Sequence, residues 1–360
     1  SKVLILYGDV PLISKQTLTS MLATVDEENI ALLTVELENP KGYGRIIRNF
    51  EGNIKAIVEE KDANDEEKDI HEVNTGIMAL SSNLLHDISP KLGNDYAQGE
   101  YYLTDLIELA NKQGKRIKGS QPQHEQEVQG VNNRLQLCEL ECWYQSQVAE
   151  ELLLSGVTLF DPHRIDVRGN LSCGKDVEID INCVFIGDVS LGNNVKIGPN
   201  CIIQQSRIGD NTVVLANTMI DNSVIAESAS IGPFARLRPG THLAKRTKIG
   251  NFVETKKTTV GEGSKINHLS YVGDAVLGES VNVGAGTITC NYDGVNKFLT
   301  EIEDGVFVGS NTSLVAPVKI GANATIGAGS TVTKDVDKEQ LAVARSKQSN
   351  INGWQRPTKK

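Results

Sequence analysis

Aliphatic residues recur every six positions through much of the second half of the chain. A helix repeats near every 3.6 residues and a half-buried strand near every 2, so neither explains this spacing. A short strand followed by a tight turn does, if three such units form each coil. The pattern predicts a parallel β-helix of hexapeptide repeats from about Asp166 to Val336. The repeating positions are Ile225, Ile231, Leu237, Leu243 and Ile249, then Val308, Leu314, Ile320, Ile326 and Val332.

One interruption breaks this rhythm. Residues 288–301, ITCNYDGVNKFLTE, separate Val283 from Val308 and contain the turn signal Asn291-Tyr292-Asp293-Gly294. An insertion in a solenoid emerges as a loop, often on the binding face. We therefore expect these residues to form a binding loop.

The first part of the chain alternates apolar strand-like runs with helical ones, which favours an α/β domain with a mostly parallel sheet. Ligands bind at the carboxyl ends of strands in such sheets, and Tyr7-Gly8-Asp9 ends the first strand. A carboxylate there suits a cation, and capping of the next helix explains Asp9 equally well. The expected strands are 1–10, 29–37, 54–63 and 73–80, and the expected helices are 14–28, 99–114 and 131–156.

Length and charge limit the organisation. The 360 residues allow two domains. We expect the first domain at 1–131, a linker helix at 132–156, the β-helix domain at 157–345 and a C-terminal tail at 346–360. The net charge of −10 argues against nucleic acid as a partner.

Compartment follows from what the chain lacks and from its thiols. No apolar run is long enough to span a bilayer, and no signal peptide opens the chain. The six cysteines are scattered without a CxxC pair, which indicates reduced thiols in a cytoplasmic protein. Cys138 and Cys142 lie four apart on an expected helix, where we interpret them as core filling.

Candidate chemistry gathers between Arg236 and Tyr271. Seven cations lie in residues 236–257 against one acid, Glu254, so this stretch is either a phosphate site or a solvated face paired with acids elsewhere. Residues about eighteen apart share a face of the coil, which brings Arg238 and Lys256 toward His268. Histidine titrates near neutral pH and suits a general base. No Ser-His-Asp pattern suggests a covalent intermediate, which favours direct transfer to an amine.

Ten motifs resemble one known family. They are LYGDVPLI, GYGRI, EVNTGI, GEYYLTD, GVNNRLQL, IGPFARLRPG, GNFVETKK, NHLSYVGDA, NVGAGTITCNYDG and GWQRP. Together they resemble the bacterial bifunctional N-acetylglucosamine-1-phosphate uridyltransferase/glucosamine-1-phosphate N-acetyltransferases. The resemblance implies a Rossmann-like nucleotidyltransferase domain followed by a left-handed parallel β-helix. It also implies a cytoplasmic homotrimer that makes UDP-N-acetylglucosamine for cell-wall and lipopolysaccharide synthesis.

The resemblance assigns the acetyltransferase to the β-helix, where glucosamine-1-phosphate is acetylated from acetyl-CoA. His268 is then the base that takes the amine proton. The sugar-phosphate ligands are Arg238, Lys256, Tyr271, Asn282 and Lys297. The acetyl-CoA contacts are Ala285, Asn291, Tyr292, Ser310, Ala328 and Arg345, with the backbone N–H of Ala285 as an oxyanion donor.

The resemblance assigns the uridyltransferase to the first domain, where UTP and N-acetylglucosamine-1-phosphate react with Mg²⁺ and release pyrophosphate. Asp9 and Asn132 match the metal ligands, although the same oxygens would accept Mn²⁺. The nucleotide and sugar contacts are Tyr7, Gly8, Asp9, Gly44, Glu59, Asn74 and Asn132, with Thr104 in a further sugar motif.

The family begins with a Gly-rich nucleotide loop that has no counterpart here. We therefore expect about the first hundred residues of the family pattern to be missing and the uridyltransferase activity to be impaired. Two alternatives stay open: another hexapeptide-repeat sugar-phosphate nucleotidyltransferase, and a non-catalytic β-helix that only trimerises. The NHLSY and NYDG motifs argue against the first, and the combination of His268, Lys256 and Arg238 argues against the second.

Overall fold

The computed structural model describes residues 1–92 and 103–359. It divides into two compact units, Ser1–Tyr144 and Gln145–Lys360. The boundary falls within α5 (Arg134–Leu154), the helix expected at 132–156. The expected helix 99–114 begins outside the described residues, and its described part is α4 (Asp105–Lys112). In the described part of the chain, no helix combines the length and apolar character needed to cross a membrane.

The first unit is an α/β layer structure. Side chains alternate between the two faces of the central strand β2 (Asn29–Glu36). Ile30 packs on one face, in the cluster that holds Leu106 of α4, whereas Leu33 packs on the other, in the cluster that holds Met21 of α1 (Lys15–Thr24). The elements are β1 (Lys2–Ile5), α1 (Lys15–Thr24), β2 (Asn29–Glu36), β3 (Arg45–Arg48), β4 (Ile54–Val58), α2 (Asp65–Lys68), β5 (Glu72–Ser81), α3 (Ser82–Ile88), η1 (Ser89–Lys91), α4, β6 (Arg116–Ser120), η2 (Glu125–Val128) and the start of α5.

The α/β class is confirmed, but the mostly parallel sheet is wrong for this unit. The strand order is β4-β3-β5-β2-β6, with β1 also on β5. Only β2 and β6 pair in parallel, whereas β5 runs antiparallel to β1, β2 and β3, and β3 runs antiparallel to β4. Parallel neighbours need a long crossover. The connections between β3, β4 and β5 are turns and the four-residue α2. They are too short for a crossover, so these strands pair antiparallel.

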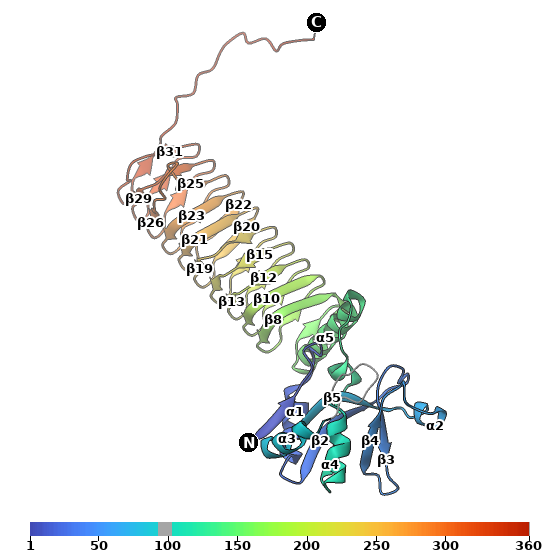
Figure 1. Ribbon diagram of the computed structural model, residues 1–360. Coiled ribbons are helices and arrows are strands. Elements are labelled where there is room, and N and C mark those ends of the chain that lie inside the picture. The colour runs from blue at the N-terminus through green and yellow to red at the C-terminus, as the bar shows by residue number, and fades with distance from the viewer. Residues whose placement is uncertain (93–102, 360) are drawn as a thin grey trace. The chain divides into compact units, whose positions relative to one another are not determined.

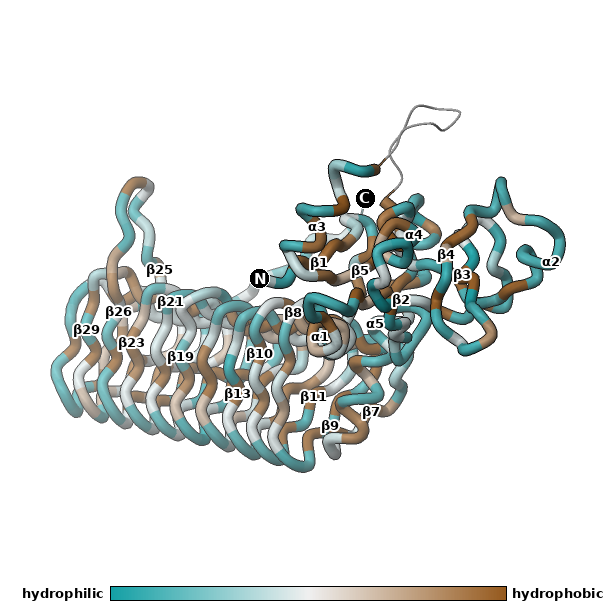
Figure 2. Tube along the Cα trace, turned by 60° about the horizontal axis from the view of Figure 1, so that its bottom comes forward, coloured by the Kyte–Doolittle hydropathy of each residue, from teal (hydrophilic) through white to brown (hydrophobic). Residues whose placement is uncertain are grey.

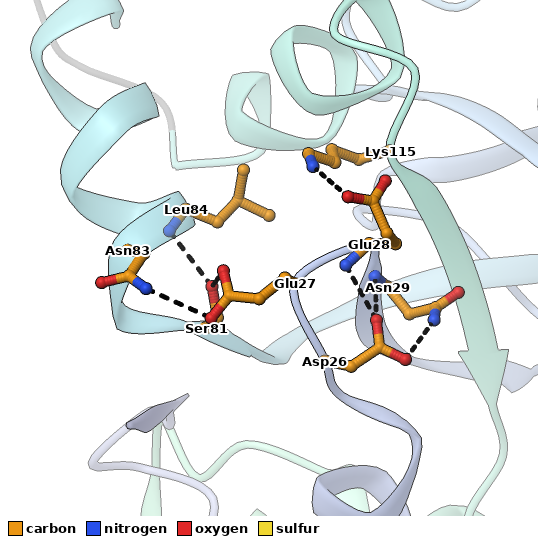
Figure 3. Close-up of polar contacts among 8 residues, drawn as sticks. All are labelled: Asp26, Glu27, Glu28, Asn29, Ser81, Asn83, Leu84 and Lys115. Atoms are coloured by element: carbon orange, nitrogen blue, oxygen red, sulfur yellow. Dashed lines mark hydrogen bonds and ion pairs between the residues drawn. The ribbon is translucent and has the colours of Figure 1, made fainter.

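The turn between α1 and β2 is tied to the start of α3 and to the segment between α4 and β6 (Figure 3). The carboxylate of Asp26 accepts from the backbone N–H groups of Glu28 and Asn29 at 2.8 and 2.9 Å. The first of these bonds is the largest cause of the lowered pKa of Asp26. Glu27 accepts from Ser81, which caps α3, and Glu28 pairs with Lys115 at 2.9 Å. The start of β2 is therefore fixed by polar contacts as well as by packing.

The second unit is the predicted parallel β-helix, with its strands stacked coil upon coil (Figure 1). All ten positions of the six-residue repeat are buried, which confirms that they form the core. The solenoid also extends beyond the expected 166–336. After α5 its elements are β7 (Thr158–Leu159), η3 (Pro162–Arg164), β8 (Ile165–Cys173), β9 (Glu178–Ile179), β10 (Cys183–Leu191), β11 (Lys196–Ile197), β12 (Ile202–Gln204), β13 (Arg207–Ile208), β14 (Val213–Val214), β15 (Met219–Asp221), β16 (Val224–Ile225), β17 (Ser230–Ile231), β18 (Arg236–Leu237), β19 (Thr241–Leu243), β20 (Lys248–Asn251), β21 (Glu254–Val260), β22 (Lys265–His268), β23 (Tyr271–Leu277), β24 (Asn282–Val283), β25 (Ile288–Cys290), β26 (Thr300–Ile302), β27 (Phe307–Val308), β28 (Ser313–Val315), β29 (Val318–Ile320), β30 (Thr325–Ile326), β31 (Thr331–Val332) and β32 (Leu341–Ala342).

Each coil has three faces. The first face is the sheet from β7 to β32, and the other two are joined where long strands bend through a corner. Residues 184–186 of β10 pair with β12, for example, whereas residues 190–191 pair with β13. Corner residues often have positive φ, as at Asn200 and Asn217, where Asn is tolerated better than most side chains.

The expected loop leaves the solenoid between β25 and β26 (Figure 2). Lys265 pairs with Asn282, 17 residues later, but Asn282 pairs with Phe307, 25 residues later. The additional residues lie at Asn291–Leu299, called the ejected loop below. Its base is closed by a hydrogen bond from the Phe298 N–H to the Asn291 carbonyl.

Candidate active sites

One cavity of about 420 Å³ in the first unit collects most residues expected at the nucleotide site. Gly8 lies between two of its lining residues but is not itself in the lining. The lining residues that the motifs assigned are Tyr7, Asp9, Gly44, Glu59, Asn74, Thr104 and Asn132. Those that sequence analysis missed are Val10, Lys41, Gly42, Tyr43, Thr75, Gly76, Val128 and Gly130.

The turn at Gly76 shapes this cavity. Gly76 has φ +77°, and a Cβ there would lie 1.9 Å from the ring of Tyr7, so only glycine lets the tyrosine lie over β5. The side-chain oxygen of Asn74 accepts from the Gly76 N–H at 2.9 Å, and the Asn74 N–H donates to the Gly44 carbonyl at 2.8 Å. These hydrogen bonds hold the Gly44 segment and the Asn74–Gly76 turn of β5 together at one side of the cavity.

Asp9 and Asn132 approach each other through the backbone. The N–H of Val131 donates to the Asp9 carbonyl at 2.8 Å, and the N–H of Asn132 donates to Gln136 at 2.8 Å. One carboxylate and one amide oxygen suit a hard cation that completes its shell with substrate oxygens and water. Within residues 1–92 and 103–359, no cluster of three or more His, Cys, Asp or Glu residues could hold a metal. A site here would therefore depend on the substrate for further ligands.

Glu59 lines the cavity, and its surroundings shift the pKa of its carboxyl group. Burial raises its pKa, and the nearby carboxylates of Asp62 and Asp105 raise it further. Gly44 leaves room beside it, because a Cβ there would lie 3.3 Å from a Glu59 oxygen. Such a carboxyl suits hydrogen bonding to a neutral sugar better than pairing with phosphate.

In the solenoid, His268 ends β22 beside an unforeseen partner. Its Nδ1 lies 2.7 Å from the side-chain oxygen of Asn251, one coil earlier in the register of β20 and β22. With the Asn251 oxygen as the acceptor, Nδ1 is the donor, and the lone pair of the neutral imidazole is then on Nε2. His268 is exposed, so Nε2 is available to accept a proton. Asn251 lies in the GNFVETKK motif, but nothing in its spacing indicated this contact.

Small residues follow His268 along the same corner. Continuing the register of β22, β24, β27 and β30 by two residues places Ala285, Ser310 and Ala328 in line with His268 on successive coils. The N–H of Asn311 donates to the Ala285 carbonyl, and Arg345 donates to the Ala328 carbonyl at 2.5 Å. The structure thus aligns Ala285, Ser310 and Ala328 with His268 on successive coils and ties Arg345 to the last of them.

The three expected phosphate-binding cations also meet. Arg238 pairs with Glu254 at 2.7 Å. The register of β18 and β21 pairs Leu237 with Thr255, which sets Arg238 beside Lys256 on the next coil. Lys297 is the largest cause of the lowered pKa of Lys256, with a smaller contribution from Arg238. Tyr271 pairs with Glu254 in the register, and its ring occupies the space above Gly273.

Other members of the basic stretch are not part of this group. Lys245 pairs with Glu227 at 2.6 Å, and Arg246 pairs with Glu262. The solvated-face interpretation is therefore right for these two residues.

The remaining candidates lie on β24 and the ejected loop. Asn282 lies on the first face between Lys265 and Phe307. Asn291 is only 8% exposed and donates its side-chain amide to Asp274 at 2.5 Å. Tyr292 is exposed and pairs across the loop with Lys297. The loop therefore carries residues expected for both substrates.

Two family models match parts of the solenoid, and one of them describes a class of bacterial transferases. Residues 299–334 match the family model of the bacterial transferase hexapeptide (six repeats), and residues 167–243 match that of the GMPPB C-terminal domain.

Curated relatives then identify the family. The bifunctional protein GlmU of Marinobacter nauticus is 63% identical over 359 residues, covering 100% of this chain and 79% of that protein. GlmU of Cellvibrio japonicus is 60% identical over 358 residues, covering 99% of this chain and 79% of that protein. GlmU of Saccharophagus degradans is 60% identical over 360 residues, covering 100% and 80%. The chain belongs to the GlmU family, which confirms the expected enzyme: a bifunctional transferase that makes UDP-N-acetylglucosamine.

Proposed function

We propose that the solenoid carries the acetyltransferase, with His268 as general base. The amine nitrogen of glucosamine-1-phosphate attacks the thioester carbonyl of acetyl-CoA. The C–S bond then breaks, CoA leaves as the thiolate, and Nε2 of His268 takes the proton from the amine. The observation that carries this assignment is the Asn251–His268 hydrogen bond, because it leaves the lone pair on the exposed nitrogen.

The surrounding residues divide between the two substrates. Arg238, Lys256 and Lys297 bind the sugar phosphate, with Tyr271 and Asn282 beside the sugar. The small residues in line with His268 let an extended thioester approach the solenoid, and the Ala285 N–H stabilises the oxyanion. The acetyl-CoA contacts in this proposal are Ala285, Asn291, Tyr292, Ser310, Ala328 and Arg345.

The first unit carries uridylyl transfer in this proposal. Asp9 and Asn132 would hold Mg²⁺, which when bound offsets the charge that develops on the phosphates of UTP. Gly44, Glu59, Asn74 and Thr104 hold the N-acetylglucosamine moiety. Tyr7 and Gly8 contact the nucleotide, and the rigid Asn74–Gly76 turn keeps Tyr7 in place.

A homotrimer is supported by apolar residues at one corner of the solenoid. Phe234, Phe252 and Leu269 are 49%, 55% and 63% exposed, and all three have positive φ. Large side chains in this conformation cost about 1–2 kcal/mol each. The rings of Phe234 and Phe252 stack at 5.3 Å. Covering these side chains with neighbouring subunits would offset the strain, and the ejected loop would then help to complete a site between subunits.

The functional division follows the sequence-based boundaries: 1–131, 132–156, 157–345 and 346–360. The structural boundary inside α5 is compatible with a helix that serves both units. All six cysteines are unpaired, which supports reducing, cytoplasmic surroundings.

Release of free CoA tests the proposal. Incubation with acetyl-CoA and glucosamine-1-phosphate is expected to release thiol, and His268→Ala is expected to abolish release while the trimer stays intact. Equal rates in both proteins would favour the non-catalytic scaffold. UTP-dependent pyrophosphate release, compared between the wild type and Asp9→Ala, tests the first unit separately.

A further inference from the structure

Asp274 lies where the solenoid chain turns beneath the ejected loop. It is half-buried within β23 and has φ 47°, a conformation that only a few residue types adopt readily. Its carboxylate accepts the side-chain amide of Asn291, the first loop residue, at 2.5 Å. A hydrogen bond to a charged acceptor is roughly twice as strong as a neutral one. One buried amide and one carboxylate thus anchor the start of the loop.

Asp274 also lies beside the cation group, because the residue before it, Gly273, pairs with Lys256 in the register of β21 and β23. Its carboxylate raises the pKa of Lys256, opposing the dominant effect of Lys297. Arg238 is already paired with Glu254. Lys297 belongs to the ejected loop and pairs across it with Tyr292. Loop position and cation repulsion are therefore linked: Asp274 holds the loop near Lys256, while Lys297 resists that approach.

A phosphate group between these cations would remove the repulsion. A dianion near Lys256 and Lys297 turns an unfavourable like-charge contact into two favourable ones.

We propose that Asp274 is a positioning residue that holds the ejected loop over the sugar-phosphate site, so that sugar-phosphate binding strengthens CoA binding. The inference rests on the proposed acetyltransferase function. The loop is the coupling element because it carries Lys297 for one substrate and Tyr292 for the other. Coupling between two ligands is reciprocal and is typically 5- to 150-fold.

Two substitutions of Asp274 test the effect of its side chain without changing the backbone conformation. Asp274→Asn keeps an oxygen acceptor for Asn291 and suits positive φ. Asp274→Gly removes the side chain and also suits positive φ, so neither variant adds backbone strain. Glu301→Gln is the matched control, because it neutralises an exposed carboxylate on the neighbouring strand β26.

The measurement is the dissociation constant of CoA by calorimetry, with and without saturating glucosamine-1-phosphate; these two ligands cannot react with each other. We expect the sugar phosphate to tighten CoA binding at least fivefold in the wild type and in Glu301→Gln. Asp274→Gly is expected to reduce the effect below twofold, and Asp274→Asn to retain part of it. Because the coupling is reciprocal, the KM for glucosamine-1-phosphate at saturating acetyl-CoA should rise in Asp274→Gly by about the factor that the coupling loses. The dissociation constant of CoA without the sugar phosphate should stay near the wild-type value, a split that general loss of structure would not produce.

Two results would overturn the inference: no coupling in the wild type, or full coupling in Asp274→Gly. Either result in a protein that still acetylates glucosamine-1-phosphate leaves the proposed function standing. A wild-type protein that binds both ligands but transfers no acetyl group would instead refute the proposed function.

Discussion

Replacing Asn251 tests the proposed role of His268 as a general base. Asn251→Ala deletes the acceptor that lies 2.7 Å from Nδ1, so the imidazole loses the contact that fixes its proton and orientation. A hydrogen bond between neutral groups contributes about 0.5–1.5 kcal/mol. At about 1.4 kcal/mol per tenfold change, kcat for acetyl transfer should fall roughly two- to twelvefold.

Asn251→Asp tests the same contact by placing a negative charge beside Nδ1 instead of removing the acceptor. A carboxylate facing Nδ1 stabilises the imidazolium, and a protonated ring cannot accept the amine proton. The acid limb of the kcat/KM profile should therefore move to higher pH, by about one unit for a partner at an exposed site. Activity near neutral pH should fall severalfold and recover as the pH rises.

Both variants are assayed by CoA release across the acid limb. Asn170→Ala, at an exposed position on β8, is the matched control and should behave like the wild type. The assignment of His268 as a base oriented by Asn251 is refuted if Asn251→Ala keeps the wild-type kcat and Asn251→Asp leaves the acid limb unmoved.

Three further predictions concern the two units separately. Gly76→Ala puts a methyl group 1.9 Å from the Tyr7 ring, so UDP-N-acetylglucosamine binding by calorimetry should weaken at least tenfold while acetyl transfer is unchanged; normal binding would contradict the cavity assignment. Ile266→Ala removes a side chain that is 0% exposed and should lower the free energy of unfolding in urea by about 2–5 kcal/mol, whereas a loss below about 1 kcal/mol would contradict the packing. Burial raises the pKa of Cys201 to about 12, so at pH 8 its thiol stays protonated and resists alkylation in the folded protein. Cys138 is exposed and should react quickly. Mass spectrometry of the labelled protein should find Cys201 modified only after unfolding.

The solenoid was predictable because an apolar core residue is required at regular six-residue steps along the chain. Each coil must supply an apolar side chain at every face, so Ile249 and Ile320 appear in step with their neighbours and are fully buried. A departure from that step leaves excess chain, which must emerge as a loop. The insertion after Cys290 could therefore be located by counting alone.

Sheet direction and side-chain partners were not predictable in this way. Alternating strands and helices suggested parallel pairing, but the short connection through α2 leaves no crossover helix. Cys138 and Cys142 were interpreted as core filling and are exposed, because α5 has apolar residues on more than one side. The contact between Asn251 and His268 depends on register and rotamer across two coils, which no single-sequence spacing specifies.

In the solenoid, the residues that stabilise the fold point inward and the candidate site residues point outward. This division explains why the site was harder to predict than the fold. In a stack of coils each repeat is stabilised mainly by its neighbours, and that requirement falls on inward positions such as Ile266. Two residues later the chain points outward at His268, where packing imposes no residue type. Outward residues on successive coils nevertheless lie in line, because Lys265, Asn282 and Phe307 keep one register even across the coil with the longer spacing. The ejected loop can therefore be added without displacing the residues in line with His268, and the active site can be built from several coils while each coil keeps the same core.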